Sequence, residues 1–252
     1  MKNLKCFFAL IGFVSFLHAD VKKEGVLPMY EPCCSGISMV FLPYNPNILI
    51  VGDQIAALSF SMASQMEQAK LFCFSSEEAD FETLNRYSKI HSNIHPYFGL
   101  FYTKQQGGLC PYFPAPSQTA YTNRFAGSLL EPTESFYPIL FKEKRLLPTF
   151  YLPQFCKKEN LLKMHMLWLD CGGTELQVLK SCPPLVNSAI VIYVKTYHQP
   201  IRKHISVFND INQYLISCGF ELVSHYIYDD IIGDALYVKS KYVSAVFRIK
   251  EI

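Results

Sequence analysis

The stretch NILIVGDQIAALSFSMASQMEQAKLFCFSSEEADF, residues 47–81, decides the fold. It contains an apolar run at 48–51, a turn at 52–54, a helical pattern over 56–66 and a second apolar run at 71–74. Strand, tight turn, helix and strand are the parts of a βαβ unit in a parallel sheet. The helix that follows the first turn of such a unit offers free N–H groups and a positive dipole end to a cofactor. The stretch therefore predicts an α/β domain with a ligand site at its first turn.

The end of the second predicted strand lacks the acid that usually binds a ribose. In this type of fold a carboxylate at that position contacts the ribose hydroxyls. Here the position holds Ser75, followed by Ser76. A hydroxyl makes one neutral hydrogen bond where a carboxylate makes two charged ones, so a cofactor is expected to bind more weakly here.

The length and net charge of the chain limit the classes of function that it can have. Its 252 residues suit one α/β domain after removal of a leader, and 50% apolar residues can fill a sizeable core. The formal net charge is +2, and no long Lys/Arg block occurs. Binding to nucleic acid through charge alone is therefore poorly supported.

The N-terminus, residues 1–19, has the pattern of a secretory signal peptide. Lys2 and Lys5 precede an uncharged run at 6–17, and Ala19 follows near the expected cleavage point. The run is too short to span a bilayer comfortably, so no stable membrane span is expected after cleavage. The pattern predicts an exported protein, periplasmic or secreted. An uncleaved N-terminal membrane anchor and a buried N-terminal helix are the alternatives, because Leu17 fits the cleavage pattern poorly.

The nine cysteines do not form a metal-binding pattern. No pair of CxxC motifs occurs, which argues against a structural zinc site, and we expect no metal. Export would permit disulfides. Cys73 and Cys171 lie in or beside predicted core strands, where a free thiol packs as a small hydrophobic group. The sequence leaves the disulfide pairing open.

The rest of the chain alternates strands and helices around one long insert. Residues 20–46 form a Pro-rich lead-in, and the domain proper is expected over 47–252. The insert at 104–134 is rich in Gly, Pro and aromatic residues, which either cover a ligand or pack on the sheet edge. Further strands are expected at 94–102, 135–152, 164–170, 189–195, 220–228 and 235–247, and further helices at 77–87, 153–162, 174–181 and 204–217.

This order predicts a mostly parallel sheet covered on both faces. The last two strands follow one helix and are joined by a short turn, expected at 232–234. The final strand should therefore run antiparallel to the others. Class I methyltransferases have this closing hairpin, and dinucleotide-binding dehydrogenases usually lack it. The absence of GxGxxG from the first turn also argues against a dehydrogenase.

Four segments resemble the FkbM-type family of S-adenosylmethionine-dependent methyltransferases. They are ILIVGDQIAALSFSMA (48–63), LFCFSSEEADFETL (71–84), LWLDCGGTELQVLKS (167–181) and YLISCGFELV with GDALYVK (214–239). Together with GSLLEPT (127–133), they cover residues 47 to 239. The resemblance implies a Rossmann-like, seven-stranded class I methyltransferase sheet with strand order 3-2-1-4-5-7-6. It also implies S-adenosylmethionine as cofactor and a small-molecule or sugar hydroxyl as methyl acceptor.

The resemblance carries candidate site residues with it. The cofactor loop corresponds to Gly52, Asp53 and Gln54, and the ribose end to Ser75 and Ser76. Asp170, which the family's third motif keeps, is the catalytic candidate, since it could contact the cofactor amine or deprotonate an acceptor hydroxyl. A structural alternative for Asp170, and for Glu175 beside it, is capping of the next helix.

Several positions depart from the family pattern. Ile50 stands for the acid before the first glycine, Ala56 for the second glycine and Ser75 for the glutamate after the second strand. In the third motif, Trp168 replaces the family's lysine and Gly172 its first glutamate, while Gly173 and Glu175 are kept. Asp53 or Glu77 could substitute for the missing ribose acid. The departures, together with export, open a second interpretation: an inactive methyltransferase fold that binds a partner through the same site or the 104–134 insert.

Overall fold

The computed structural model describes residues 7–9, 40–103, 108–114, 127–134, 143–228 and 230–247. The predicted leader at 1–19 lies outside the described residues, apart from the short strand β1 (Phe7–Ala9), which pairs antiparallel with β2 (Val40–Leu42). None of the described helices is both long and apolar enough to cross a membrane.

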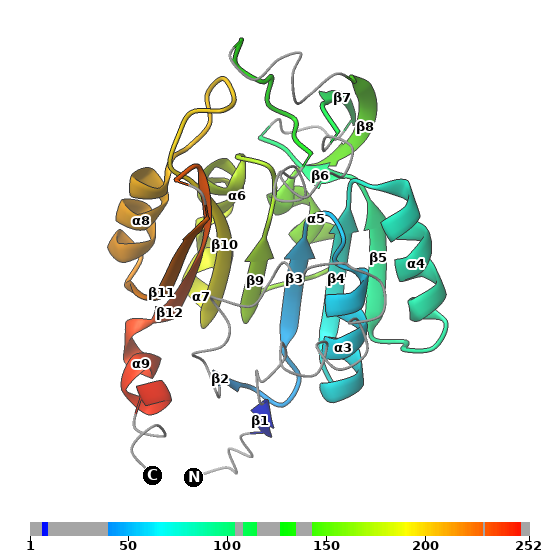
Figure 1. Ribbon diagram of the computed structural model, residues 1–252. Helices are drawn as coiled ribbons and strands as arrows, with labels where there is room; N and C mark the ends of the chain where they lie inside the picture. The colour runs from blue at the N-terminus through cyan, green and yellow to red at the C-terminus, as the bar shows by residue number, and fades with distance from the viewer. Residues whose placement is uncertain are drawn as a thin grey trace, which may run out of the picture.

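A seven-stranded sheet forms the centre of the molecule (Figure 1). Its order is β11-β12-β10-β9-β3-β4-β5, which becomes 3-2-1-4-5-7-6 when the strands are numbered along the chain and read from β5. β12 runs antiparallel to both of its neighbours, and the other pairings are parallel. The strands are β3 (Asn47–Val51), β4 (Lys70–Ser75), β5 (Ile94–Phe98), β9 (Met166–Leu169), β10 (Val191–Tyr197), β11 (Phe220–Tyr228) and β12 (Ile232–Lys239).

This strand order is that of the class I methyltransferase fold, so the predicted fold class is confirmed. The predicted central pair is also confirmed, because β3 and β9 are direct neighbours, with Ile48 opposite Met166 and Val51 opposite Leu169. The short apolar runs of the sequence form these strands because a strand in a parallel sheet is covered on both faces.

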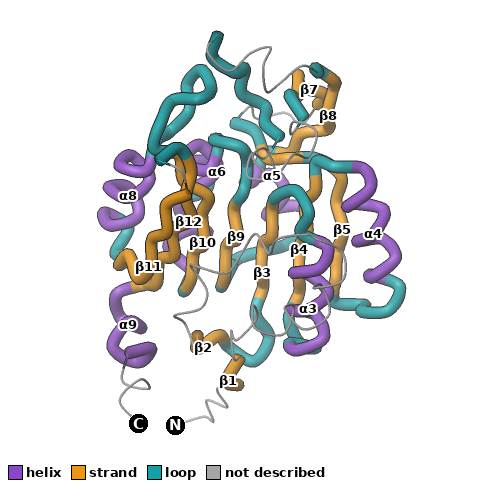
Figure 2. Tube along the Cα trace, in the orientation of Figure 1, coloured by secondary structure: helices purple, strands orange, loops and turns teal. Residues whose placement is uncertain are grey.

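Helices cover both faces of the sheet (Figure 2). Alternate residues of β3 point to opposite faces, as strand geometry requires. Ile48 and Ile50 pack with α3 (Ala56–Gln65), α4 (Glu78–Ser88) and α9 (Ser240–Phe247). Leu49 and Val51 belong to the other core, which includes residues of α5 (Leu152–Lys158), α6 (Glu175–Ser181), α7 (Pro183–Ser188) and α8 (Phe208–Ser217).

A second, three-stranded sheet lies beyond the carboxyl ends of the parallel strands, at the top of Figure 1. Its order is β6-β8-β7, with β6 at Leu100–Phe101, β7 at Gly108–Tyr112 and β8 at Arg145–Phe150. The insert, read from the sequence as a loop, therefore contributes a strand. The single strand expected at 94–102 is broken at Gly99, whose φ is +135° and where a Cβ would lie 2.3 Å from the carbonyl oxygen of Pro148.

Three local predictions were wrong. The expected turn at 232–234 lies inside β12, because Gly233 marks a close backbone approach to β11: a Cβ there would lie 2.4 Å from the carbonyl oxygen of Tyr226. The strand expected at 235–247 ends at Lys239, and α9 follows and packs Tyr242 and Val243 on the core. The helix expected at 204–217 begins only at Phe208, as α8.

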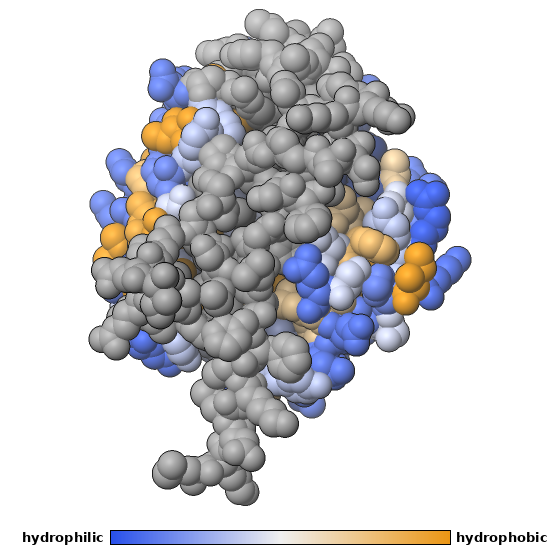
Figure 3. All heavy atoms as spheres, turned by 60° about the horizontal axis from the view of Figure 1, so that its bottom comes forward, coloured by the Kyte–Doolittle hydropathy of each residue, from blue (hydrophilic) through white to orange (hydrophobic). Residues whose placement is uncertain are grey.

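The opposite end of the molecule comes forward in Figure 3. The described surface in this view is largely hydrophilic, with separate apolar side chains. Ile90, which follows α4, is an exposed apolar side chain at 68%. Isolated apolar side chains of this kind are ordinary on protein surfaces. The polar groups that bear on function gather instead at the carboxyl ends of the strands.

Substitution of Phe74 tests how much the aromatic core beneath that site contributes to stability. The side chain is fully buried, and its ring centroid lies 4.4 to 5.0 Å from those of Tyr97, Phe101, Phe150 and Phe155. Phe74→Ala should lower the free energy of unfolding in urea by about 3–5 kcal/mol, because it leaves a cavity among these rings. Leu109→Ala, at a 64% exposed position of β7, is the control and should change it by less than about 0.5 kcal/mol. Equal effects of the two variants would contradict this description of the core.

Candidate functional site

The first turn of the βαβ unit lies between β4 and β9. The Gly52 N–H donates to the carbonyl oxygen of Phe74 at 3.0 Å, and a Cβ at Gly52 would lie 3.1 Å from the Cβ of Asp170. Gln54 follows with a φ of 59° and is exposed. Glycine is therefore required at position 52 by the close approach of the β9 end.

The N-terminus of α3 already has a carboxylate. The N–H groups of Ile55 and Ala56 donate to the two carboxylate oxygens of Asp80, at 3.2 and 3.1 Å. The sequence suggested that these N–H groups would be open to a cofactor. In the structure, Asp80 of α4 takes the place that an anionic ligand group would fill at a helix N-terminus.

Ser75 and Ser76, at the end of β4, are both fully buried. The Ser75 Oγ accepts a hydrogen bond from the N–H of Glu77 and donates one to the carbonyl oxygen of Glu77, both at 3.2 Å. The Ser76 hydroxyl donates to Oδ1 of Asp53 and lies 2.7 Å from the hydroxyl of Tyr112. The two serines at the expected ribose position are thus bonded to other parts of the protein.

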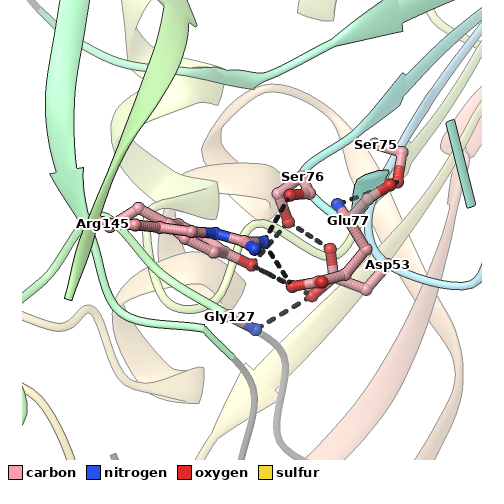
Figure 4. A network of polar contacts seen from close by, with 7 residues as sticks. Asp53, Ser75, Ser76, Glu77, Gly127 and Arg145 are labelled. Atoms are coloured by element: carbon pink, nitrogen blue, oxygen red, sulfur yellow. Dashed lines mark hydrogen bonds and ion pairs between the residues drawn. The ribbon is translucent and has the colours of Figure 1, made fainter. Parts of the chain in front are cut away.

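A network of polar contacts joins this turn to the insert (Figure 4). We call it the closing network; it comprises Asp53, Ser76, Glu77, Tyr112, Gly127 and Arg145. The Gly127 N–H donates to Oδ2 of Asp53 at 3.0 Å, and the Tyr112 hydroxyl donates to Oε1 of Glu77 at 3.1 Å. Arg145 donates to the same Glu77 oxygen at 3.1 Å and to the carbonyl oxygen of Ser76 at 3.0 Å. Asp53 and Glu77, the two acids that could replace the missing ribose-binding carboxylate, are therefore both hydrogen-bonded within the protein.

Two glycines, Gly127 and Gly172, allow the insert to lie directly against the ends of the strands. A Cβ at Gly127 would lie 1.7 Å from the Tyr112 hydroxyl oxygen, and a Cβ at Gly172, after β9, would lie 2.1 Å from the carbonyl oxygen of Gly127. Backbone hydrogen bonds of 2.8 and 2.9 Å between Phe113 and Ser128 hold this segment to the end of β7. Gly127 thus lies directly between the turn after β3 and the turn after β9, the switch point at which open α/β sheets bind ligands.

The network changes the charge state of Asp53. Burial raises the pKa of its carboxyl to about 7, against the hydrogen bond from Ser76, which lowers it, and with repulsion from Glu77. Near neutral pH this carboxyl exchanges a proton readily. Its proton also makes it a poorer partner for a pair of ribose hydroxyls than a permanently ionised acid.

Asp170 lies at the end of β9 beside a buried lysine. Its Oδ2 is 3.9 Å from Nζ of Lys195, which donates to Oδ1 of Asp234 at 3.0 Å, and the Tyr228 hydroxyl donates to Asp234. Oδ1 of Asp170 is buried and has no hydrogen-bond partner among the described residues. Burial raises the pKa of Asp170 to about 6, while Lys195 lowers it. The sequence predicted Asp170 as a site residue but did not predict Lys195 and Asp234. These two could have been found, because each is a charged residue within an otherwise apolar strand.

Glu175 holds the turn that follows Asp170. Its Oε1 accepts hydrogen bonds from the N–H groups of Cys171 and Gly173, at 2.8 and 3.1 Å. Burial raises its pKa to about 7. These contacts agree with the structural alternative for Glu175, a carboxylate that organises the loop at the start of α6.

The strand order defines a protein of the class I methyltransferase architecture. No family model and no curated protein matches the chain. Among solved structures it is similar to a Methanococcus jannaschii fibrillarin pre-rRNA processing protein (11% identity, 80% of this chain and 70% of that one, TM-score 0.46). It is also similar to Aeropyrum pernix fibrillarin with bound S-adenosyl-L-methionine (14% identity, 79% of this chain and 70% of that one, TM-score 0.41). A third similar structure is M. capricolum TrmK with S-adenosyl-homocysteine (9% identity, 77% of this chain and 62% of that one, TM-score 0.39).

The architecture implies S-adenosylmethionine at the carboxyl ends of β3 and β4. The donors and acceptors at that position do not fit this group, because they are bonded to one another. Asp53 accepts from Ser76 and Gly127, Glu77 accepts from Tyr112 and Arg145, and the Ser75 side chain is bonded within its own turn. Of the polar side chains predicted for the cofactor, Asp53 and Ser76 bond each other and the insert, Ser75 bonds the backbone of Glu77, and Gln54 is exposed.

The raised pKa of Glu175 should make the free energy of unfolding depend on pH, which can be measured. A carboxyl whose pKa is raised from 4.5 to about 7 by folding binds its proton more tightly in the folded state, so stability falls as pH rises through this range. Glu175→Gln keeps an acceptor for the two N–H groups and removes the titration. The loss of unfolding free energy between pH 4 and pH 8 should be smaller in this variant by on the order of 2–3 kcal/mol. Glu82→Gln, on the exposed side of α4, is the control; identical pH profiles for all three proteins would refute the assignment.

Proposed function

We propose that this chain is a methyltransferase-fold protein that acts as a binding module and does not bind S-adenosylmethionine in the usual position. The closing network is the observation that supports this proposal. In this network Gly127 and Tyr112 bond Asp53 and Glu77, the two acids that could otherwise hold a ribose. The partner would bind at the same end of the sheet, where β7 and β8 expose the apolar side chains of Leu109 and Leu146.

The energetic cost of opening the network supports the same proposal. A cofactor would have to break the contacts of Asp53 with Ser76 and Gly127 and those of Glu77 with Tyr112 and Arg145. At a net value of about 1 kcal/mol for each of these four contacts, opening costs about 4 kcal/mol. That cost weakens binding by roughly a thousandfold relative to an open site.

Export, if it occurs, points in the same direction. S-adenosylmethionine is made and kept in the cytosol, and the leader pattern at 1–19 would take the protein away from it. We propose descent from FkbM-type methyltransferases, on the four resembling segments, with the sheet retained as a scaffold. The fold can persist without its cofactor, because its strands are held by apolar packing on both faces.

Calorimetric titration of the full chain with S-adenosylmethionine and S-adenosylhomocysteine tests the proposal. We expect no saturable binding up to millimolar ligand. Ser75→Glu should also fail to bind, and it should lower the Tm strongly, because it buries a carboxylate in a turn whose hydrogen bonds are already made. Ser75→Ala, the matched control, should cost only about 2 kcal/mol, because it removes the two hydrogen bonds between Ser75 and Glu77. Micromolar binding by the natural sequence, or tenfold tighter binding by Ser75→Glu, would contradict the proposal and support an active methyltransferase.

A second candidate function is O-methylation of a small-molecule or sugar hydroxyl, and the position of Asp170 favours it. The carboxylate is 8% exposed, has one oxygen without a partner among the described residues, and lies 3.9 Å from the cation of Lys195. With a pKa of about 6, it can accept a proton from a hydroxyl at neutral pH.

Transfer of a labelled methyl group from S-adenosylmethionine to a panel of sugars and hydroxylated small molecules tests this second function. If it holds, Asp170→Asn should lower the transfer rate by about a hundredfold or more, because the base is lost. Asp210→Asn, on the exposed side of α8, is the control and should leave the rate unchanged. The first proposal expects no transfer in any of the three proteins.

A further inference from the structure

Three aromatic rings hold the first turn of α8 to the edge of the central sheet. The Phe208 ring, at the start of α8, stacks on the His225 ring of β11, with 3.9 Å between centroids and 12° between planes. His198, directly after β10, lies 5.1 Å from His225 and 5.4 Å from Phe208. These three distances place His198 beside the stacked pair. We call the three residues the ring clamp.

Each imidazole of the ring clamp has one buried nitrogen. Nε2 of His198 and Nε2 of His225 are buried, and neither has a hydrogen-bond partner in the part of the chain that the structure describes. A neutral imidazole tolerates this, because one of its two nitrogens carries no proton. A protonated imidazole needs acceptors for two N–H groups, and a buried N–H without an acceptor is costly. The face of Phe208 attracts a cation only weakly and does not supply that acceptor.

Two acids act on the imidazoles of the ring clamp. Asp230, in the turn between β11 and β12, acts on His198, and Asp234 of β12 acts on His225. Asp234 already accepts from Lys195 at 3.0 Å and from the Tyr228 hydroxyl. The other charged or titratable side chains of β11, α8 and the loop between β10 and α8 are Glu221, Asp210, Arg202, Lys203 and His204.

Three of these side chains are bound away from the rings. Asp210 accepts from the N–H of Val207 at 3.2 Å, and Lys203 pairs with Glu131 at 3.1 Å. Arg202 donates to the carbonyl oxygen of Leu130 at 3.3 Å. A proton on either imidazole would therefore be placed beside rings and beside acids that lie at their periphery.

Burial keeps both imidazoles mainly neutral at pH 7. It lowers the pKa of His198 below the ordinary value of 6.5, although Asp230 raises it. It also lowers the pKa of His225, as does repulsion from His198, although Asp234 raises it. A group whose pKa is lowered by folding takes its proton more readily when the structure around it opens. The contribution of the ring clamp to stability is thus present above pH 6.5 and is lost as pH falls through the folded pKa values.

The loop that leaves the ring clamp also holds the insert. Residues 198–207 join β10 to α8, and the Lys203 N–H donates to the carbonyl oxygen of Glu131 at 2.7 Å. The Thr133 N–H donates to the carbonyl oxygen of Ile201 at 3.1 Å. These partners lie a few residues after Gly127 of the closing network. A displacement of the 198–207 loop would therefore reach the segment that closes the candidate site.

We propose that the ring clamp is an acid-sensitive switch. While both imidazoles are neutral, it fixes the start of α8 and the 198–207 loop to β11. When either imidazole takes a proton, the rings separate, the first turn of α8 opens to water, and the loop loosens its hold on the insert. This inference goes beyond the binding function proposed above and stands whether or not that function holds.

Amide hydrogen exchange of the full chain, followed by NMR at pH 7.5 and pH 5.0, tests the proposal. Rates are compared as protection factors, which removes the intrinsic effect of pH on exchange. The amides of Lys203 and Ile211 report on the loop and on the first turn of α8, since they donate to Glu131 and Val207. Their protection at pH 5.0 should be lower, by up to about tenfold for each unit by which folding lowers a histidine pKa. The amides of β3 should keep theirs.

Two results in the natural protein would overturn the proposal. One is unchanged protection of Lys203 and Ile211 between the two pH values. The other is an NMR titration in which both imidazoles of the ring clamp keep a pKa of 6.5 or higher.

Variants assign the effect to the two histidines. The double variant His198→Phe/His225→Phe keeps aromatic rings without their titration, so its protection factors should be the same at both pH values. His91→Gln is the control and should show the full fall, because His91 also packs on a phenylalanine, Phe60 at 4.8 Å, but its Nε2 has a partner in Ser64 at 3.2 Å. A natural fall in the double variant would show that another group is the sensor. If the double variant does not fold, the single variants decide: a fall as large as the natural one in both would refute the proposal.

Discussion

The hydrogen bond from the Gly127 N–H to the Asp53 carboxylate is the contact on which the rest of the site depends. It joins the turn after the first strand of the sheet to a segment that is more than seventy positions away in the chain. With Gly127 held there, Tyr112 packs against it and reaches Ser76 and Glu77, and Arg145 completes the ion pair with Glu77. The result is a cofactor position whose polar groups are satisfied by the protein itself, which is how buried polar groups are stabilised.

This closure accounts for the residue types found at positions 75 and 172. A carboxylate at position 75 would have no partner in the buried turn, whereas a serine bonds its own backbone. A side chain at position 172 would collide with the carbonyl oxygen of Gly127, which accounts for the glycine there. The residues at positions 75 and 172 are therefore consistent with each other in the closed arrangement.

The sequence predicted the sheet well because the information for it is local. Apolar runs such as 48–51 and 71–74, with a breaker-free helix between them, define a βαβ unit without reference to distant residues. Gly52, Asp53, Ser75 and Ser76 could be placed together for the same reason, since the carboxyl ends of adjacent parallel strands share one edge. The partners of these residues could not be found, because Tyr112 and Gly127 come from an insert with no periodic pattern and Arg145 comes from β8, beyond that insert. Gly233 and α9 were misread because tertiary contacts, to β11 and to the core, override the local signal.

Amide hydrogen exchange at Gly127 is the measurement that tests the closed arrangement most directly. The account predicts that this N–H is protected in the free protein, in step with the amides of Phe113 and Ser128, and that excess S-adenosylmethionine leaves its exchange rate unchanged. Rapid exchange at Gly127 in the free protein, or a change in its rate on addition of S-adenosylmethionine, would show an open and ligand-responsive site and would contradict the account.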